Sequence, residues 1–333
     1  MSTKRRDLHR ARVRRDRIRR EKHGQHAHES SGPPAPVVEH PFAAERALYE
    51  IQALLDGQEF ESLDEANARL ADLTSGGRLS ERANSWKQDD PKWRAQQLAY
   101  DAMEAGDIVE ALRLSNAAFK LDPDCTDAQR LMVSVMPMSL ENRLLLMREV
   151  VEKAERSLGE SFFDGRTGHF WSDVTTRPYM RAKQHLSELL TQAGRLQEAI
   201  AVCERMLELN PDDNQAMRYP LIGLYLAVGR PESANRVLSR HPDQERILGT
   251  FAWARVFERW LSGKLDEAQA ALFRARGVNP YAERYLSGKR PLPEEPPAYF
   301  RPGEDTDAQV CACNLAVACK SHPEFREWLR GQR

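Results

Sequence analysis

Long apolar runs are missing from this sequence of 333 residues. No stretch approaches the ~18 consecutive apolar residues from which a transmembrane helix is built. The charged N-terminus is also not followed by the apolar core of a secretory signal peptide. We therefore expect no membrane-embedded segment and no membrane partner.

Cysteine is scarce: there are five residues, an odd number without the spacing of a disulfide framework. This usage argues against a disulfide-stapled scaffold and favours a reducing, cytoplasmic location. Cys311, Cys313 and Cys319 lie near a histidine toward the C-terminus, a combination that invites comparison with a zinc site. No Cys-x-x-Cys pair is present, however, and Cys311, Leu315 and Cys319 fall on one helical face. We predict that these cysteines belong to an apolar core, and we expect no metal or other cofactor.

The familiar motifs of catalysis and nucleotide binding are also absent. There is no P-loop, no dinucleotide fingerprint and no Gly-x-Ser-x-Gly nucleophile elbow. The segment 168–173, Gly-His-Phe-Trp-Ser-Asp, does contain the residue types of a catalytic triad. A triad is assembled in space by a base oriented on a nucleophile, so adjacency in one short segment does not indicate one. We predict no catalytic residues and no enzymatic activity.

This segment is interpreted as a structural turn. In this interpretation Phe170 and Trp171 fill a gap between neighbouring helices, and Asp173 pairs with Arg177. Because exposed loops often carry binding functions, a binding loop is the alternative. Its candidate residues are His169, Phe170, Trp171, Asp173 and Arg177.

Charge is distributed unevenly along the chain. Residues 1–22 hold eleven Lys and Arg against three Asp and Glu, a net charge of +8, whereas the whole chain carries −1. The remaining residues therefore sum to −9. This arm is either a solubilising tail or an electrostatic contact with RNA, DNA or an acidic surface. Its candidate contact residues are Arg5, Arg6, Arg14, Arg15, Arg19 and Arg20.

Helical periodicity is clearest between residues 178 and 214. Leucines and alanines from Leu186 to Ala193 form one apolar stripe, and a second stripe runs from Leu196 to Leu209. Gly194 separates the stripes at a position suited to a left-handed C-cap, and Pro211 ends the second helix. We expect two helices that pack on each other and on neighbours.

The spacing of this hairpin recurs along the chain. In each complete copy, five residues separate a glycine from an alanine, and twelve separate the alanine from a proline. The complete copies are Gly106, Ala111 and Pro123; Gly194, Ala199 and Pro211; and Gly263, Ala268 and Pro280, with a partial copy at Gly229 and Ala234. The glycines at 194, 229 and 263 lie 35 and 34 residues apart. Such a period indicates a helical repeat.

These blocks resemble the tetratricopeptide (TPR) repeat family. The resemblance rests on GRLQEA and GKLDEA, on the variants GDIVEA and GRPESA, and on the terminal Asn-Pro or Asp-Pro. It implies an all-α fold, a right-handed α-solenoid of helical hairpins. From about Ser161 onward the chain further resembles a subset that includes the suppression-of-tumorigenicity family and bacterial TPR relatives. That resemblance rests on the Phe-Trp, Arg-Pro-Tyr and Asn-Pro-Tyr patterns around the repeats.

Four segments are predicted along the chain. Residues 1–41 form a disordered basic arm and linker, and 42–90 an N-terminal helical hairpin and polar connection. Residues 91–280 form the solenoid, with a degenerate helix pair broken at Pro137 and a non-repeat loop near 159–178. Residues 281–333 form a Pro-rich extension and a C-terminal capping helix with Trp328 as its anchor.

The TPR resemblance also implies a concave groove lined by the first helix of each repeat. Its positions hold Trp93, Gln96, Tyr100 and Met103 in the first clear copy, Arg181, Gln184, Glu188 and Thr191 in the best-formed copy, and Tyr219 in the next. In the last copy we expect Trp253, Phe257 and Trp260 to be core residues because the register shifts by one. Aromatic and amide side chains in a groove suit a protein or peptide ligand.

These features predict a non-catalytic protein–protein interaction scaffold or adaptor in the cytoplasm. The alternative is a nucleic-acid- or ribosome-associated factor that uses the basic arm. Neither hypothesis identifies the partner or the oligomeric state.

Overall fold

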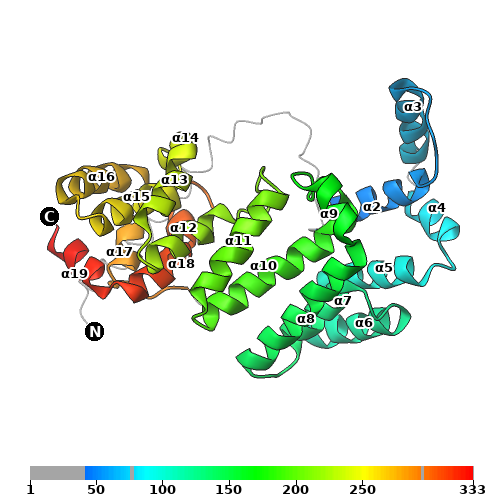
Figure 1. Ribbon diagram of the computed structural model, residues 1–333, viewed down its shortest axis with the longest axis horizontal. Helices are drawn as coiled ribbons and strands as arrows, with labels where there is room; N and C mark the ends of the chain where they lie inside the picture. The colour runs from blue at the N-terminus through cyan, green and yellow to red at the C-terminus, as the bar shows by residue number, and fades with distance from the viewer. Residues whose placement is uncertain (1–41, 76–78, 294–295, 333) are drawn as a thin grey trace, which may run out of the picture. The chain divides into compact units, whose positions relative to one another are not determined.

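The protein is all-α. The computed structural model describes residues 42–75, 79–293 and 296–332, and these ranges contain helices and no strand. The predicted basic arm and linker, residues 1–41, lie outside them. Antiparallel helix pairs follow one another along the chain, consistent with a TPR-like solenoid (Figure 1). The pairs are α5 (Pro91–Glu104) with α6 (Ile108–Leu121), α7 (Thr126–Val135) with α8 (Leu140–Leu158), α10 (Arg177–Gln192) with α11 (Leu196–Leu209), α12 (Arg218–Ala227) with α13 (Pro231–Arg240), and α15 (Gly249–Leu261) with α16 (Leu265–Val278).

Glycine turns join the two helices of three pairs. Gly194, Gly229 and Gly263 have φ of 72°, 69° and 73°, the left-handed region in which glycine has no steric cost. After Gly194, the amide of Arg195 donates to the carbonyl of Leu190 at 2.9 Å, which is the Schellman closure of a helix end. The first pair differs, because Gly106 is not among the residues with positive φ. There Asp107 caps α6 by accepting hydrogen bonds from the next turn.

The repeated prolines follow helix ends as predicted, and the repeated alanines are buried. Ala199, Ala234 and Ala268 are fully buried where the two helices of each pair approach. The helices α6, α11 and α16 all end two residues before a proline. The degenerate pair is also confirmed, with α7 ending before Pro137 and α8 beginning after it.

The N-terminal region holds three helices, α2 (Ala43–Leu55), α3 (Leu63–Thr74) and α4 (Leu79–Trp86). Ser62 caps α3 by accepting a hydrogen bond from the amide of Glu65 at 3.2 Å. The segment expected to be a polar connection instead forms α4. Helix α4 packs against α2, whereas the predicted hairpin placed α3 against α2.

Two short helices interrupt the repeats after α8. They are α9 (Glu160–Arg166) and the 3-10 helix η2 (Val174–Thr176), and the segment 167–173 between them forms turns. A further short helix, α14 (Pro242–Glu245), follows α13.

The C-terminal region contains α17 (Ala282–Leu286), α18 (Asp305–Ser321) and α19 (Pro323–Gly331). We predicted one terminal helix, but Pro323 divides it in two because the residue before a proline avoids helical geometry. Helix α18 lies along α12, α15 and α17 (Figure 1). It therefore packs on the first helices of two repeats. At Gly223 of α12 a Cβ atom would lie only 2.0 Å from the carbonyl oxygen of Asn314, so glycine permits this close approach.

Candidate functional site

Helix α2 covers the predicted groove positions of α5. Tyr49 stacks on Trp93 with 4.9 Å between ring centroids, and the hydroxyl of Tyr100 donates to Glu45 at 3.0 Å. Trp93 and Tyr100 are consequently buried. Met103 is half-buried, and its sulfur lies 3.2 Å from the guanidinium of Arg130. These side chains are held by contacts within the chain.

The predicted groove residue Arg181 lies in an ion cluster. Its guanidinium donates to Glu45 of α2 at 2.7 and 2.9 Å and binds both carboxylate oxygens of Asp127 on α7. Gln96 of α5 donates to Asp127 at 3.0 Å. Burial opposes ionisation of Asp127, but the Arg181 and Arg130 guanidiniums outweigh it and hold the pKa of this carboxyl at about 2. Arg181 and Gln96 therefore join helices rather than face solvent.

The last repeat is covered by the C-terminal helices. Trp253 and Phe257 of α15 are fully buried as predicted, but the physical reason is different. Phe257 stacks on Phe325 of α19 at 3.9 Å between centroids, so a groove position is buried by a helix that lies over it. The anchor of α19 is the fully buried Phe325, whereas Trp328 is half-buried beside it.

A buried carboxylate fixes the start of α18. Asp307 accepts hydrogen bonds from the amide of Gly249 at 3.0 Å, from Asn279 Nδ2 at 2.8 Å and from the amide of Gly303 at 3.0 Å. Trp253 Nε1 in turn donates to the carbonyl of Asn279 at 3.1 Å. These bonds tie the C-terminal segment to the N-terminus of α15.

Between these two covered regions a hollow of about 670 Å³ lies against α10, α12 and α18. We call it the central hollow. It brings together four of the predicted groove residues, Gln184, Glu188, Thr191 and Tyr219. The remaining lining residues are Ser187, Gln192, Gln215, Ala216, Met217, Pro220, Leu224, Pro296, Phe300, Val310, Cys313 and Asn314.

The lining of the central hollow combines apolar side chains with amide and hydroxyl side chains and one charge. Glu188 is the single charged side chain among the described lining residues, and it accepts a hydrogen bond from Gln184 Nε2 at 3.4 Å. Partial loss of hydration raises the pKa of Glu188, opposed by Gln184 and by the more distant Arg130. Gln215 donates to Gln184 at 2.9 Å and to the carbonyl of Met180 at 3.2 Å. Its own Oε1 atom is buried and accepts no hydrogen bond from the described residues.

The loop that forms one wall of the central hollow has an unusual backbone. Asp213 and Ala216 have φ of 54° and 58°, values that cost little for an aspartate but more for an alanine. The Asp213 carboxylate holds the loop by accepting from the amide and the guanidinium of Arg218, at 3.0 and 2.6 Å. The wall is thus positioned by a buried ion pair.

The segment 168–173, here called the Phe-Trp loop, is part of the packing between helices. Phe170 is fully buried and contacts Phe163 and Tyr179 with 5.0 and 6.1 Å between centroids. The guanidinium of Arg177 lies over the Trp171 ring, 4.9 Å from the ring centroid.

The predicted Asp173–Arg177 pair does not form. Asp173 instead bonds to Arg166 at 3.3 Å, and Arg177 reaches Glu45 at 3.4 Å. The side chain of His169 is exposed and, within the described ranges, makes no hydrogen bond to Ser172 or Asp173.

The three C-terminal cysteines do not act together. Cys311 and Cys319 are buried in the main core with Leu315, as predicted, and Cys313 is half-buried at the central hollow. Burial raises the pKa of the Cys319 thiol to about 11, so this thiol is protonated at neutral pH. Among the described residues, no group of three or more His, Cys, Asp and Glu side chains is arranged to hold a metal ion.

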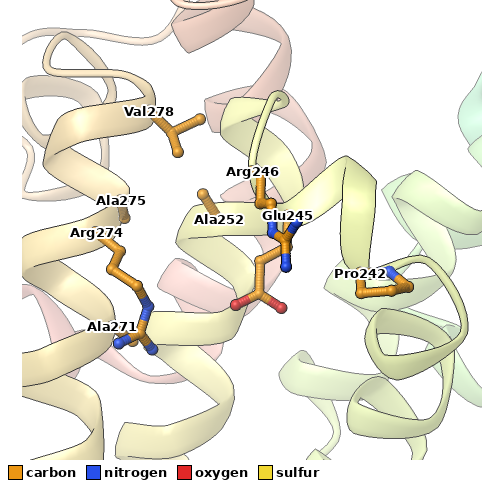
Figure 2. Close-up of a pocket in the computed structure, with 8 residues that line it drawn as sticks. All are labelled: Pro242, Glu245, Arg246, Ala252, Ala271, Arg274, Ala275 and Val278. Atoms are coloured by element: carbon orange, nitrogen blue, oxygen red, sulfur yellow. The ribbon is translucent and has the colours of Figure 1, made fainter.

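A second hollow of about 630 Å³ lies between α14, α15 and α16. Figure 2 shows Arg274 reaching in from α16, with Glu245 and Arg246 on the side of α14. Ala252, Ala271 and Ala275 also line it. Glu245 already pairs with Arg255 at 3.0 Å, and none of the predicted groove residues lines this hollow. The central hollow is therefore the stronger candidate.

Comparison with known proteins supports the repeat interpretation over part of the chain. The family description "Tetratricopeptide repeat" matches residues 190–246, which span α11 to α14. No curated protein matches the chain in sequence. None of the helices in the described ranges combines the length and apolar character needed to cross a bilayer.

Sequence reasoning missed that α2 and α18 cover the groove. One signal was Gly223 within the helix α12, since a glycine inside a helix permits close approach of another backbone. A second was the stripe formed by Phe42 at the N-cap of α2 and by Glu45 and Tyr49 on α2, whose aromatic and acidic side chains match the groove residues of α5 and α10.

Proposed function

We propose that the protein is a non-catalytic adaptor that binds a short segment of a protein partner in the central hollow. The TPR match supports a protein-interaction module, since TPR repeats commonly serve this role. The observation that carries the proposal is that groove positions of two neighbouring repeats meet there while the flanking positions are covered. A hollow of about 670 Å³ has room for several side chains, which suits an extended peptide.

A blocking variant tests this proposal. Thr191 is half-buried at the rim of the central hollow, so Thr191→Arg should fill the hollow without disturbing the core. The matched control is Thr74→Arg on the exposed end of α3. In affinity purification from the native source, a partner should be retained by wild type and Thr74→Arg and lost by Thr191→Arg. If every retained protein survives Thr191→Arg, the proposal is wrong.

The basic arm supports a second candidate function. Its net charge of +8 over residues 1–22 suits contact with nucleic acid, as in a ribosome-associated factor. This hypothesis predicts retention on heparin and RNA that falls steeply with salt and requires residues 1–30. If full-length and truncated proteins elute at the same salt concentration, the nucleic-acid hypothesis fails, while peptide binding at the central hollow is unaffected.

We also propose that the protein acts in the cytoplasm and belongs to the TPR subset around the suppression-of-tumorigenicity family. The five cysteines are unpaired, which supports a reducing compartment. The aromatic and Asn-Pro-Tyr patterns support this subset, and in this chain Phe170 and Asn279 of these patterns are buried. Imaging of a tagged full-length chain tests the location, and export from the cytoplasm would contradict it.

A further inference from the structure

We propose that the central hollow selects a peptide in which a lysine or arginine lies beside apolar residues. This inference rests on the proposed peptide binding and adds the chemistry of the ligand. Three properties of the hollow support it: an unpaired acid, a buried acceptor without a donor, and apolar walls.

The unpaired acid is Glu188. Within the described ranges it forms no ion pair, and its hydrogen bond to Gln184 at 3.4 Å is long. The nearby cation Arg130 is committed elsewhere, at 3.5 Å from the buried Asp127. Because no described cation lines the hollow, a carboxylate there attracts a positively charged ligand group.

The acceptor without a donor belongs to the side-chain amide of Gln215. The Nε2 atom of Gln215 donates to two carbonyl oxygens, which fixes the orientation of its amide group. Its Oε1 atom is then a buried acceptor without a donor among the described residues. A buried acceptor left unpaired costs stability, and a lysine ammonium or arginine guanidinium brings only donors.

The apolar walls come from three parts of the chain. Leu224 and Tyr219 belong to α12, Val310 to α18, and Phe300 to the segment before α18. Phe300 is 37% exposed, so it still has apolar surface to bury. A ligand that covers this surface gains hydrophobic stabilisation, and apolar residues beside the basic one supply it.

An acidic ligand is disfavoured by the same groups. The one arginine predicted in the groove positions of α10 is Arg181, and it is neutralised by Glu45 and Asp127. A peptide carboxylate in the central hollow would face Glu188 without a compensating cation. The hollow therefore differs from a groove that clamps a peptide through its C-terminal carboxylate.

Selection from a random short-peptide library displayed on phage, with the full chain as bait, tests the inference. Wild type should enrich peptides with lysine or arginine next to apolar residues. Glu188→Lys should reverse the preference toward aspartate and glutamate. Synthetic versions of the enriched basic peptides should bind Glu188→Gln about tenfold more weakly than wild type, because a charged hydrogen bond is lost. Thr191→Arg should abolish binding and Thr74→Arg should retain it.

The outcomes separate the two proposals. Enriched peptides that Thr191→Arg no longer binds show that the hollow binds peptides. If those peptides have no preference for lysine or arginine, or if Glu188→Lys does not reverse the preference, the basic-ligand inference is wrong and peptide binding still stands. If no enriched peptide is lost in Thr191→Arg, peptide binding in the central hollow is itself wrong. Unfolding curves of Glu188→Gln and Glu188→Lys that match wild type exclude misfolding as the cause of lost binding.

Discussion

Arg181 joins three helices through its guanidinium. It binds Glu45 of α2 and Asp127 of α7 from its own position on α10. Asp127 is fully buried, so its charge depends on this partner. A buried acid deprived of its cation leaves an uncompensated charge, which costs far more than the loss of a surface ion pair.

Replacing Arg181 should therefore strongly destabilise the protein. We expect Arg181→Leu to lower the free energy of unfolding by about 3–5 kcal/mol, measured by urea denaturation at neutral pH. The control is Arg113→Leu on α6, whose exposed guanidinium pairs, among the described residues, with Glu110 alone, so we expect a much smaller loss of stability. Equal effects of the two variants would contradict the role assigned to Arg181.

His185 makes stability depend on pH. Burial, together with the Arg130 and Arg143 guanidiniums, lowers the pKa of His185 to about 4. The unfolded chain therefore takes up a proton near pH 6.5 that the folded chain does not, so this contribution is complete above pH 6.5 and lost as the pH falls toward 4. The loss at pH 5 is at most about 2 kcal/mol. In His185→Gln, the urea midpoint should fall less between pH 7 and pH 5 than it does in wild type. An equal fall in the two proteins would show that His185 does not cause the pH dependence.

Two helices outside the repeats decide which parts of the groove remain open. Helix α2 lies over groove positions of α5 and α10, and α18 lies along α12 and α15. Each is held at one end by a carboxylate, Glu45 or Asp307, that accepts hydrogen bonds from more than one element. The central hollow is the part of the groove left between them.

The close packing of α18 on α12 can be tested at Gly223. Alanine there would place its Cβ atom 2.0 Å from the carbonyl oxygen of Asn314, so the helices must move apart. We expect Gly223→Ala to lower the free energy of unfolding by at least about 2 kcal/mol. The matched control is Gly277→Ala on α16, where a Cβ atom meets nothing within 4 Å.

In the control, alanine should raise stability by about 0.5–1 kcal/mol through its better helix propensity. The two substitutions should therefore shift the thermal midpoint in opposite directions. A stabilising Gly223→Ala would show that α18 does not approach α12 so closely.

At the scale of the whole molecule, the C-terminal helices complete a core that the repeats share. The buried cluster includes Leu221 of α12, Phe257 of α15, Leu315 of α18 and Phe325 of α19. A helical repeat array needs a polar cap over its last apolar face, and here α18 and α19 also cover part of the groove face.

Removal of residues 304–333 should therefore do more than shorten the chain. Phe257 loses its stacking partner Phe325, so we expect a lower thermal midpoint and binding of the dye ANS to the exposed apolar surface. Calorimetry and ANS fluorescence check this expectation. Removal of residues 1–30 is the size-matched control and should leave both unchanged, and equal behaviour of the two truncations would contradict the role of α18 and α19.

Local physics explains why the repeats were predictable. A glycine suited to positive φ, an alanine small enough for a close helix contact and a proline that ends a helix act within a few residues of each other, as at Gly194, Ala199 and Pro211. Hence helix pairs, turns and the buried cysteine face could be predicted from the order of residues.

Contacts between distant parts of the chain determine which part of the groove is accessible to a ligand. Glu45 and Arg181 lie 136 residues apart, and His322 contacts the carbonyl of Leu226 across 96 residues. Aromatic and charged side chains such as Tyr100 and Arg181 suit a ligand-binding face and a buried contact equally well, so residue type alone does not distinguish the two. Only the placement of α2 and α18 showed that Glu188 and Tyr219 border an open hollow while Tyr100 and Arg181 do not.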